Sequence, residues 1–226
     1  MEVRDDQTVF VIDDEESVRD SIAALVEIRG LPVETFATAE DFLQRYKNDT
    51  AGCVVTDLRI ERGMTGIELQ EVLSSAGSEI PVVVISAYAS VSNAVQAMNN
   101  GAVTLLEKNC TTDELWSAIV EALKRDTECR EKKCDDESLL ERFSSLKPDE
   151  IEVMTRIVGG MLNKVIAHEM KISLRTVETR RHNILEKTRS DSVADLVRAY
   201  VQLETLLGRR PEDVLRSEAP LADHIN

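Results

Sequence analysis

The fold of this chain is decided by the stretch TVFVIDD at residues 8–14, where a continuous apolar run ends in two aspartates. Apolar runs without alternation are typical of strands that are buried on both faces of a parallel sheet. Three further runs end in a polar residue: Cys53–Thr56 leads to Asp57, Val82–Ile85 to Ser86, and Val103–Glu107 to Lys108. Ligands bind at the carboxyl ends of such strands, so we expect the polar residues to meet at one edge of the sheet. They are Asp13, Asp14, Asp57, Ser86 and Lys108.

The first 125 residues alternate strand and helix patterns, which is typical of a doubly wound α/β fold. A fifth strand is predicted at Pro32–Phe36. Helices are predicted near residues 17–29, 39–47, 66–75, 92–99 and 112–125. We therefore interpret residues 1–125 as one domain built on a five-stranded parallel sheet.

The predicted edge brings three carboxylates together, and such a cluster needs a cation. Mg²⁺ takes hard oxygen ligands and favours phosphate oxygens as further ligands. An aspartate beside it could attack a phosphoryl group, because aspartyl phosphates are a known covalent product. Lys108 would neutralise the phosphoryl oxygens, and the Ser86 hydroxyl would donate a hydrogen bond to them. Any one of these residues alone would be a cap or a surface charge, but five in order at four strand ends favour a phosphoryl site.

On these five positions, residues 1 to about 125 resemble a response-regulator receiver domain. The resemblance implies a CheY-like domain with flavodoxin-like strand order, in which Asp57 accepts a phosphoryl group from a sensor histidine kinase. It implies that Mg²⁺ is held by Asp13, Asp14, Asp57 and the backbone carbonyl of Arg59. It also implies that Ser86 and Lys108 sense the phosphoryl group and start a conformational change.

Three features depart from the pattern of that family. Asn109 follows Lys108 where the family usually has proline, and Leu105 stands where it usually has Tyr or Phe. The loop from Leu58 to Gly66 is about one residue longer than usual and lacks the common proline. The missing proline and the missing aromatic residue motivate an alternative function, in which the receiver is an atypical protein-interaction module and DNA binding does not depend on phosphate.

The charge of the chain changes sign along its length. The net charge of −15 is distributed as −12 over residues 1–125, −3 over 126–143, +3 over 144–210 and −3 over 211–226. A nucleic-acid footprint requires local positive charge, which the third segment supplies. By composition, residues 126–143 are predicted to be a linker, either irregular or a helical continuation of the preceding helix. Residues 144–210 are predicted to be a second domain, and 211–226 an acidic tail with little order.

The second domain is predicted to be all-α, with four short helices. Pro148 begins the first, Asn163–Met170 forms the second with Val165, Ile166 and Ala167 inward, Ser173 caps a third that runs to about Lys187, and Asp191 or Ser192 opens the fourth. A short helix, a tight turn and a longer basic helix indicate helix-turn-helix geometry. The residues at 163–167, 172–173, 176–178 and 181–184 resemble the LuxR-type DNA-binding domain of FixJ/NarL regulators.

Helical spacing separates two faces of the third helix. Val177 and Ile184 are predicted to point to the core, while Glu178, Thr179 and His182 are predicted to reach base edges in a major groove. Phosphate contacts are predicted for Lys164, Arg175 and Arg181, which position a protein without reading sequence. In the resembled family the fourth helix often supplies the dimer contact, so Val197, Tyr200 and Val201 are candidates, although the same residues also fit a monomer core.

Other classes of function are disfavoured by the sequence. The four cysteines form no C-x-x-C pair and the three histidines are scattered, which argues against a zinc site and against a free-standing enzyme. No apolar stretch has transmembrane length and no signal-peptide pattern is present, so we expect a cytoplasmic protein without a membrane partner. We predict a phosphorylation-dependent DNA-binding transcriptional regulator of a two-component system. Its expected partners are DNA, a sensor histidine kinase, a second copy in the active form and RNA polymerase.

Overall fold

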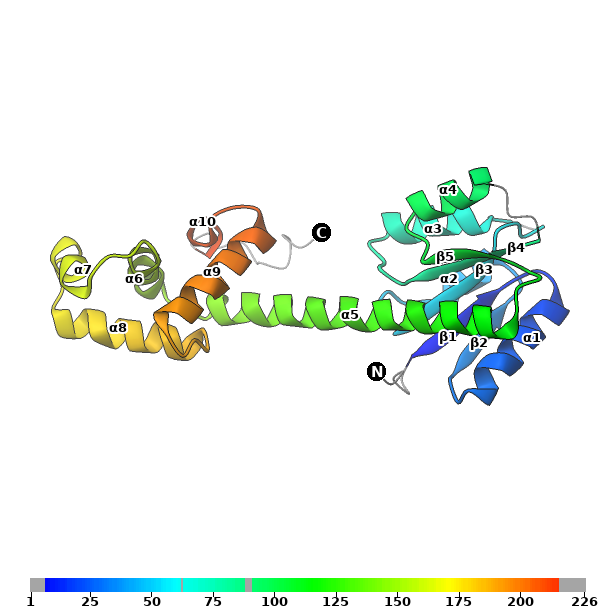
Figure 1. Cartoon of the computed structure of the whole chain (residues 1–226). Coiled ribbons are helices and arrows are strands. Elements are labelled where there is room, and N and C mark those ends of the chain that lie inside the picture. Colours follow the sequence, from blue (N-terminus) through cyan, green and yellow to red (C-terminus); the bar gives the residue numbers. More distant parts are fainter. Residues whose placement is uncertain (1–6, 62, 88–90, 216–226) are drawn as a thin grey trace. The chain divides into compact units, whose positions relative to one another are not determined.

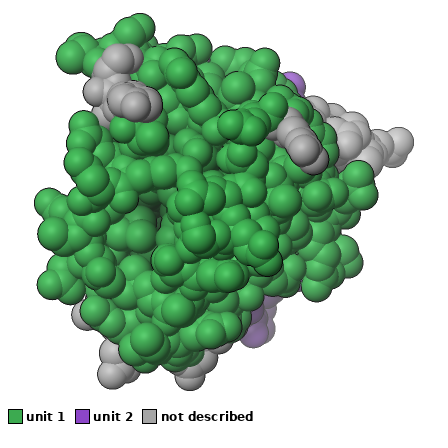
Figure 2. Space-filling model, turned by 90° about the vertical axis from the view of Figure 1, so that its right-hand side faces the viewer, with its two compact units in different colours: residues 1–131 green, residues 132–226 purple. Residues whose placement is uncertain are grey.

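The computed structural model describes residues 7–61, 63–87 and 91–215, which fall into two compact units at residues 1–131 and 132–226 (Figure 1; Figure 2). The first unit contains a parallel sheet with the strand order β2-β1-β3-β4-β5. This order confirms the predicted doubly wound receiver fold. The strands are β1 (Thr8–Ile12), β2 (Val33–Phe36), β3 (Gly52–Asp57), β4 (Val82–Ser86) and β5 (Thr104–Glu107).

Helices cover both faces of this sheet (Figure 1). Val9 and Val11 of β1 share a buried cluster with α1 and α5, whereas Phe10 of the same strand packs on the other face with α2, α3 and α4. Complete burial of a side chain such as Phe42 stabilises the fold by about 1.5–3 kcal/mol. These helices are α1 (Glu16–Ile28), α2 (Ala39–Arg45), α3 (Gly66–Ser75), α4 (Val91–Asn99) and α5 (Thr112–Ser144).

The register of the strands aligns their carboxyl ends. Ile12 pairs with Thr56, so Asp13 and Asp57 follow on neighbouring strands at the same level. Ser86 pairs with Glu107, which puts Lys108 one residue beyond the end of β4. The polar residues that end the apolar runs therefore share one edge of the sheet, as parallel pairing requires.

Helix α5 does not stop where the composition predicts a linker. It runs 33 residues without interruption, and the boundary between the two units falls inside it, at residues 131 and 132. The segment 126–143 holds no Gly or Pro, and pairs such as Asp126–Arg130 join charges four residues apart along the helix. Its early residues are buried in the first unit, and Leu139, Leu140 and Phe143 are buried in the core of the second. The charge-rich linker is thus a helix whose two ends belong to the two units.

The described part of the second unit contains the four predicted helices and, after them, one further short helix. The Ser173 hydroxyl accepts a hydrogen bond from the Thr176 amide (3.0 Å) at the start of α8, and Ser192 caps α9 through the Asp195 amide (3.2 Å). The helices are α6 (Pro148–Val158), α7 (Asn163–Glu169), α8 (Leu174–Lys187), α9 (Val193–Leu207) and α10 (Pro211–Leu215). Among the described residues, no helix combines the length and the apolar character that crossing a bilayer requires.

Two predictions about the second unit are wrong. The acidic tail was expected to have little order from Pro211 onward, but Pro211 and Val214 are buried in α10; the rest of the tail, residues 216–226, lies outside the described residues. A small apolar group there packs on the neighbouring helices despite the acidic composition. Val165 was expected to face inward but is 44% exposed, because a seven-residue helix with Ile166 in the core turns its neighbour outward.

Candidate functional site

An acidic pocket lies at the carboxyl ends of β1 and β3. One carboxylate oxygen from each of Asp13, Asp14 and Asp57 lies within 4.8 Å of the others. Asp13 is completely buried and Asp57 is 6% exposed, whereas Asp14 is half-buried. Anionic oxygen ligands in small number suit Mg²⁺, so the donor set fits that ion.

Lys108 balances the negative charge of this pocket. Its Nζ lies 2.6 Å from Asp57 Oδ2 and 2.7 Å from Asp13 Oδ2. Burial raises the pKa of Asp13, and the hydrogen bond from Lys108 opposes that rise. Burial alone would lower the pKa of Lys108, but its hydrogen bonds to Asp13 and Asp57 outweigh burial and raise it. The ammonium is therefore charged at neutral pH and holds the two aspartates together.

Backbone groups fix the orientation of the carboxylates. The Glu15 amide donates to Asp13 Oδ1 (2.9 Å), and the Arg59 amide donates to Asp57 Oδ1 (3.0 Å). Arg19 of α1 donates to the carbonyl oxygens of Asp13 (2.7 Å) and Asp14 (3.1 Å), which holds the turn after β1. Arg19 was not predicted, because a single arginine on a helix face gives no local signal of a backbone contact.

The remaining predicted residues stand at the ends of β4 and β5. Ser86 is 3% exposed, and its carbonyl oxygen accepts a hydrogen bond from the Lys108 amide (2.8 Å). The described residues contain no cis peptide bond, so the Lys108–Asn109 bond is trans. Leu105 is half-buried and packs against the core on the α2–α4 face of the sheet. The structure thus gathers the five predicted residues at one sheet edge, in direct contact or on adjacent strand ends.

A second candidate site is an open groove between α7 and α8, with a volume of about 830 Å³. Four of the six predicted DNA contacts line it: Lys164, Glu178, Arg181 and His182. Val177 and Ile184 of α8 do not line the groove and are completely buried in the core, as predicted. Arg181 also donates to Asn163 Oδ1 (3.3 Å), which ties α8 to the start of α7.

The other two predicted contacts are exposed on α8 but do not line this groove. They are Arg175 and Thr179, and the Thr179 hydroxyl donates to the Arg175 carbonyl oxygen (2.9 Å). The sequence interpretation missed the apolar part of the lining, which includes Leu162 (73% exposed) and Leu174 (38% exposed). Each of these leucines stands at the start of a helix and outside the apolar stripe that the helix buries. An apolar residue in that position is the sequence feature that could have indicated the groove.

The three dimerisation candidates on α9 differ in accessibility. Val201 is 51% exposed and Val197 is half-buried. Tyr200 is only 6% exposed, and its hydroxyl donates to the Glu212 carboxylate of α10. Tyr200 is therefore part of the core of its own unit and is not available as a surface contact, because α10 covers it.

Both units match known protein families. Residues 9–120 match the response regulator receiver domain, and residues 144–200 match the luxR family of bacterial regulatory proteins. The transcriptional regulatory protein TdiR of Thauera aromatica is 37% identical over 190 residues, covering 84% of this chain and 83% of that protein. FixJ of Bradyrhizobium diazoefficiens is 35% identical, covering 84% and 92%. The low-resolution structure of the response regulator StyR is 38% identical, covers 87% of this chain and 99% of that one, and gives a TM-score of 0.82.

Proposed function

Because the chain belongs to the response-regulator family and joins a receiver domain to a LuxR-type DNA-binding domain, it is a phosphorylation-dependent transcriptional regulator of a two-component system, and we propose that Asp57 is its phosphoryl acceptor. The observation that carries this assignment is the position of the Asp57 carboxylate, which is clustered with Asp13 and Asp14 and contacts the Lys108 ammonium. Of the three clustered carboxylates, Asp57 alone ends a strand at the centre of the sheet.

In the proposed reaction a carboxylate oxygen of Asp57 forms a bond to phosphorus while the phosphorus–nitrogen bond of a kinase phosphohistidine breaks. The Arg59 amide holds Oδ1, so the orientation of the carboxylate is set before the donor arrives. Mg²⁺, held by Asp13, Asp14, Asp57 and the Arg59 carbonyl, would supply positive charge to the phosphoryl oxygens. Lys108, which contacts Asp57 directly, would supply a second positive charge.

The proposed signal leaves the site through Ser86 and Lys108. An aspartyl phosphate adds charge and strong hydrogen-bond acceptors beside both residues. Lys108 would then exchange its contacts with Asp13 and Asp57 for the phosphoryl oxygens, and Ser86 would donate a hydrogen bond to them. Both residues stand at the ends of β4 and β5, next to α4, which exposes Val91 (83%) and Val95 (54%). We infer that this apolar face pairs two phosphorylated receivers.

The second unit would bind DNA through α8. Glu178, Thr179 and His182 are proposed to meet base edges, with Glu178 accepting from a cytosine amine. Lys164, Arg175 and Arg181 are proposed to contact phosphates. Pairing two copies raises the effective concentration of one DNA-binding unit at the second half-site once the first is bound. Exposed Val201 and half-buried Val197 on α9 remain the surface candidates for a contact between DNA-bound copies.

The alternative of a phosphate-independent interaction module is not favoured. Its motive was the absence of the usual proline and aromatic residue, but neither Asn109 nor Leu105 disturbs the approach of Lys108 to Asp57. A receiver that no longer handled phosphate would have no physical need for a buried aspartate beside two further carboxylates and a lysine.

Replacing Asp57 by asparagine tests the acceptor directly. We expect the wild-type protein, incubated with Mg²⁺ and acetyl phosphate, to gain the mass of one phosphoryl group in a bond that resists acid and breaks in base. Asp57→Asn should show no gain in mass, because a side-chain amide is too weak a nucleophile to attack the phosphoryl group of the donor. Asp49→Asn, which alters an exposed aspartate before β3, is the matched control and should be phosphorylated normally. Persistent base-labile phosphorylation of Asp57→Asn would show that another residue is the acceptor.

A further inference from the structure

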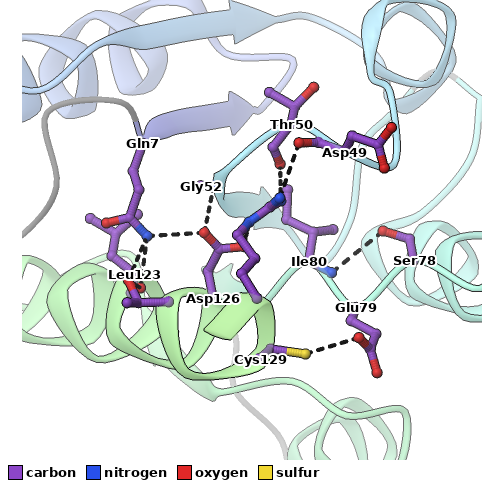
Figure 3. Close-up of polar contacts among 12 residues, drawn as sticks. Gln7, Asp49, Thr50, Gly52, Ser78, Glu79, Ile80, Leu123, Asp126 and Cys129 are labelled. Atoms are coloured by element: carbon purple, nitrogen blue, oxygen red, sulfur yellow. Dashed lines mark hydrogen bonds and ion pairs between the residues drawn. The ribbon is translucent and has the colours of Figure 1, made fainter. Parts of the chain in front are cut away.

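A buried carboxylate outside the phosphorylation pocket anchors α5 to the first unit (Figure 3). Asp126 is 3% exposed. Its Oδ2 accepts hydrogen bonds from Gln7 Nε2 (3.0 Å) and from the Gly52 amide (3.0 Å), and its Oδ1 accepts one from Arg130 Nε (2.8 Å). Three donors from three segments thus satisfy one buried charge, which is the condition under which such a charge is tolerated.

Arg130 links this arrangement to the loop that precedes β3. Its two terminal nitrogens donate to the carbonyl oxygens of Asp49 (3.0 Å) and Thr50 (2.6 Å), just before β3. The planar guanidinium can meet the Asp126 carboxylate and two carbonyls at once, which an ammonium does less well. Gly52 has φ of +146°, a conformation that favours glycine, so its amide is presented to Asp126 by local backbone geometry. We call Gln7, Asp126 and Arg130 with their partners the clamp.

The clamp and the phosphorylation pocket lie at opposite ends of the same two strands. Gln7 precedes β1 and Gly52 opens β3, whereas Asp13 and Asp57 stand where these strands end. The clamp holds α5 at its last residues in the first unit, immediately before the helix continues into the second unit. None of the clamp hydrogen bonds reaches the acidic pocket, so the chemistry of phosphorylation does not explain them.

Beyond the clamp, α5 has little support of its own. Residues 131–135 are exposed, and four of these five residues are charged. A short polar helical stretch is marginal in water, because its stability depends on the packing of its ends. An anchor at the receiver end therefore determines whether this stretch of α5 stays helical.

We propose that Asp126 and Arg130 are positioning residues that couple the receiver to the connecting part of α5. Phosphorylation then changes DNA binding only while the hydrogen bonds of the clamp are intact. This inference rests on the proposed function, because it concerns how the signal of that site leaves the receiver. The clamp residues take no part in phosphoryl transfer or in DNA contact. Their loss should therefore separate the two activities without removing either.

The test compares Arg130→Ala with Arg125→Ala in the full-length protein. Both arginines lie on α5 and pair with an acid four residues earlier, but the Arg125–Glu121 pair is exposed and Arg125 donates to no loop carbonyl among the described residues. For Arg130→Ala we expect hydrogen exchange at residues 127–134 to accelerate about tenfold or more, because hydrogen bonds from a charged group are lost. Phosphorylation by acetyl phosphate should remain within about twofold of wild type, because the pocket is untouched.

DNA binding provides the readout that a purely structural role would not move. The ratio of DNA affinities with and without acetyl phosphate should fall toward one in Arg130→Ala and stay at the wild-type value in Arg125→Ala. Arg130→Lys, which keeps the charge but not the planar fork, should restore part of the ratio. Unchanged exchange in Arg130→Ala, or equal ratios in both alanine variants, would overturn the proposal. A wild-type ratio of one would instead contradict the proposed function, and hydrogen exchange would still decide whether the clamp anchors α5.

Discussion

At the scale of single residues, the loop after Asp57 is held by a side chain from helix α2. Glu40 of α2 accepts a hydrogen bond from the Met64 amide (2.8 Å). Gly63 has φ of +90°, and a Cβ there would lie 2.5 Å from Glu40 Oε1 and 2.6 Å from Oε2. The carboxylate of Glu40 therefore packs directly on the backbone of the loop that the sequence marks as unusually long.

Removal of this contact should loosen the loop and slow phosphorylation. We expect Glu40→Ala to be phosphorylated by acetyl phosphate about tenfold more slowly, because the loop carries the amide that orients Asp57. Glu40→Gln should retain most of the rate, since an amide oxygen also accepts from the Met64 amide. Asp41→Ala removes a neighbouring exposed carboxylate from the same helical turn and serves as the control. Equal rates in the alanine variants would assign no role to Glu40.

At the scale of elements, the strands were predictable and the long-range polar contacts were not. Four of the five strands contain a continuous apolar run, and parallel pairing brings their ends together without further information. The clamp joins residues 119 and 74 positions apart, Gln7 with Asp126 and Gly52 with Asp126, and no local pattern encodes such pairs. For the same reason the sequence left open whether Tyr200 belongs to the core or to a dimer contact, because its partner Glu212 lies in a segment whose composition indicates disorder.

A buried carboxylate, that of Glu150, lies in the first turn of helix α6. Glu150 accepts from the Lys147 amide (2.8 Å) and from Lys187 Nζ (2.6 Å). Burial tends to raise the pKa of Glu150, but these hydrogen bonds outweigh it and hold the pKa below its usual value of 4.5. Because the folded-state pKa is depressed, the stabilisation is present above about pH 4.5 and is lost as the pH falls through the folded value.

We therefore expect Glu150→Gln to lower the free energy of unfolding of the second unit by about 1–3 kcal/mol at pH 7. The difference from wild type should shrink as the pH falls below about 4.5, because protonated glutamic acid resembles the amide. Urea unfolding followed by circular dichroism at pH 7 and pH 4 measures both effects. Glu152→Gln removes a partly exposed partner of Arg156 and should cost about 0.5 kcal/mol or less. If Glu150→Gln lowered the free energy of unfolding equally at both pH values, the result would contradict an ionised Glu150 with a lowered pKa.

At the scale of the whole molecule, local charge and local apolar surface matter more than totals. A chain with a net charge of −15 can bind DNA because residues 144–210 carry a net charge of +3 and place Lys164 and Arg181 on one groove. In the same way, the proposed pairing of receivers would depend on one patch. Val91, Val95 and Met98 are 83%, 54% and 49% exposed on α4, and apolar side chains grouped on one helix face mark an interaction surface.

A charge placed in this patch should separate phosphorylation from assembly. We expect Val95→Asp to accept phosphate at the wild-type rate but to remain monomeric under acetyl phosphate, because pairing would bury an unpaired carboxylate. Sedimentation velocity measures the association, and binding to DNA with two half-sites should weaken about tenfold or more when the second unit is no longer linked to the first. Ile28→Asp, at an apolar residue 82% exposed on α1, alters the opposite face of the sheet and should dimerise like wild type. Phosphorylated Val95→Asp that still sediments as a dimer would move the pairing surface away from α4.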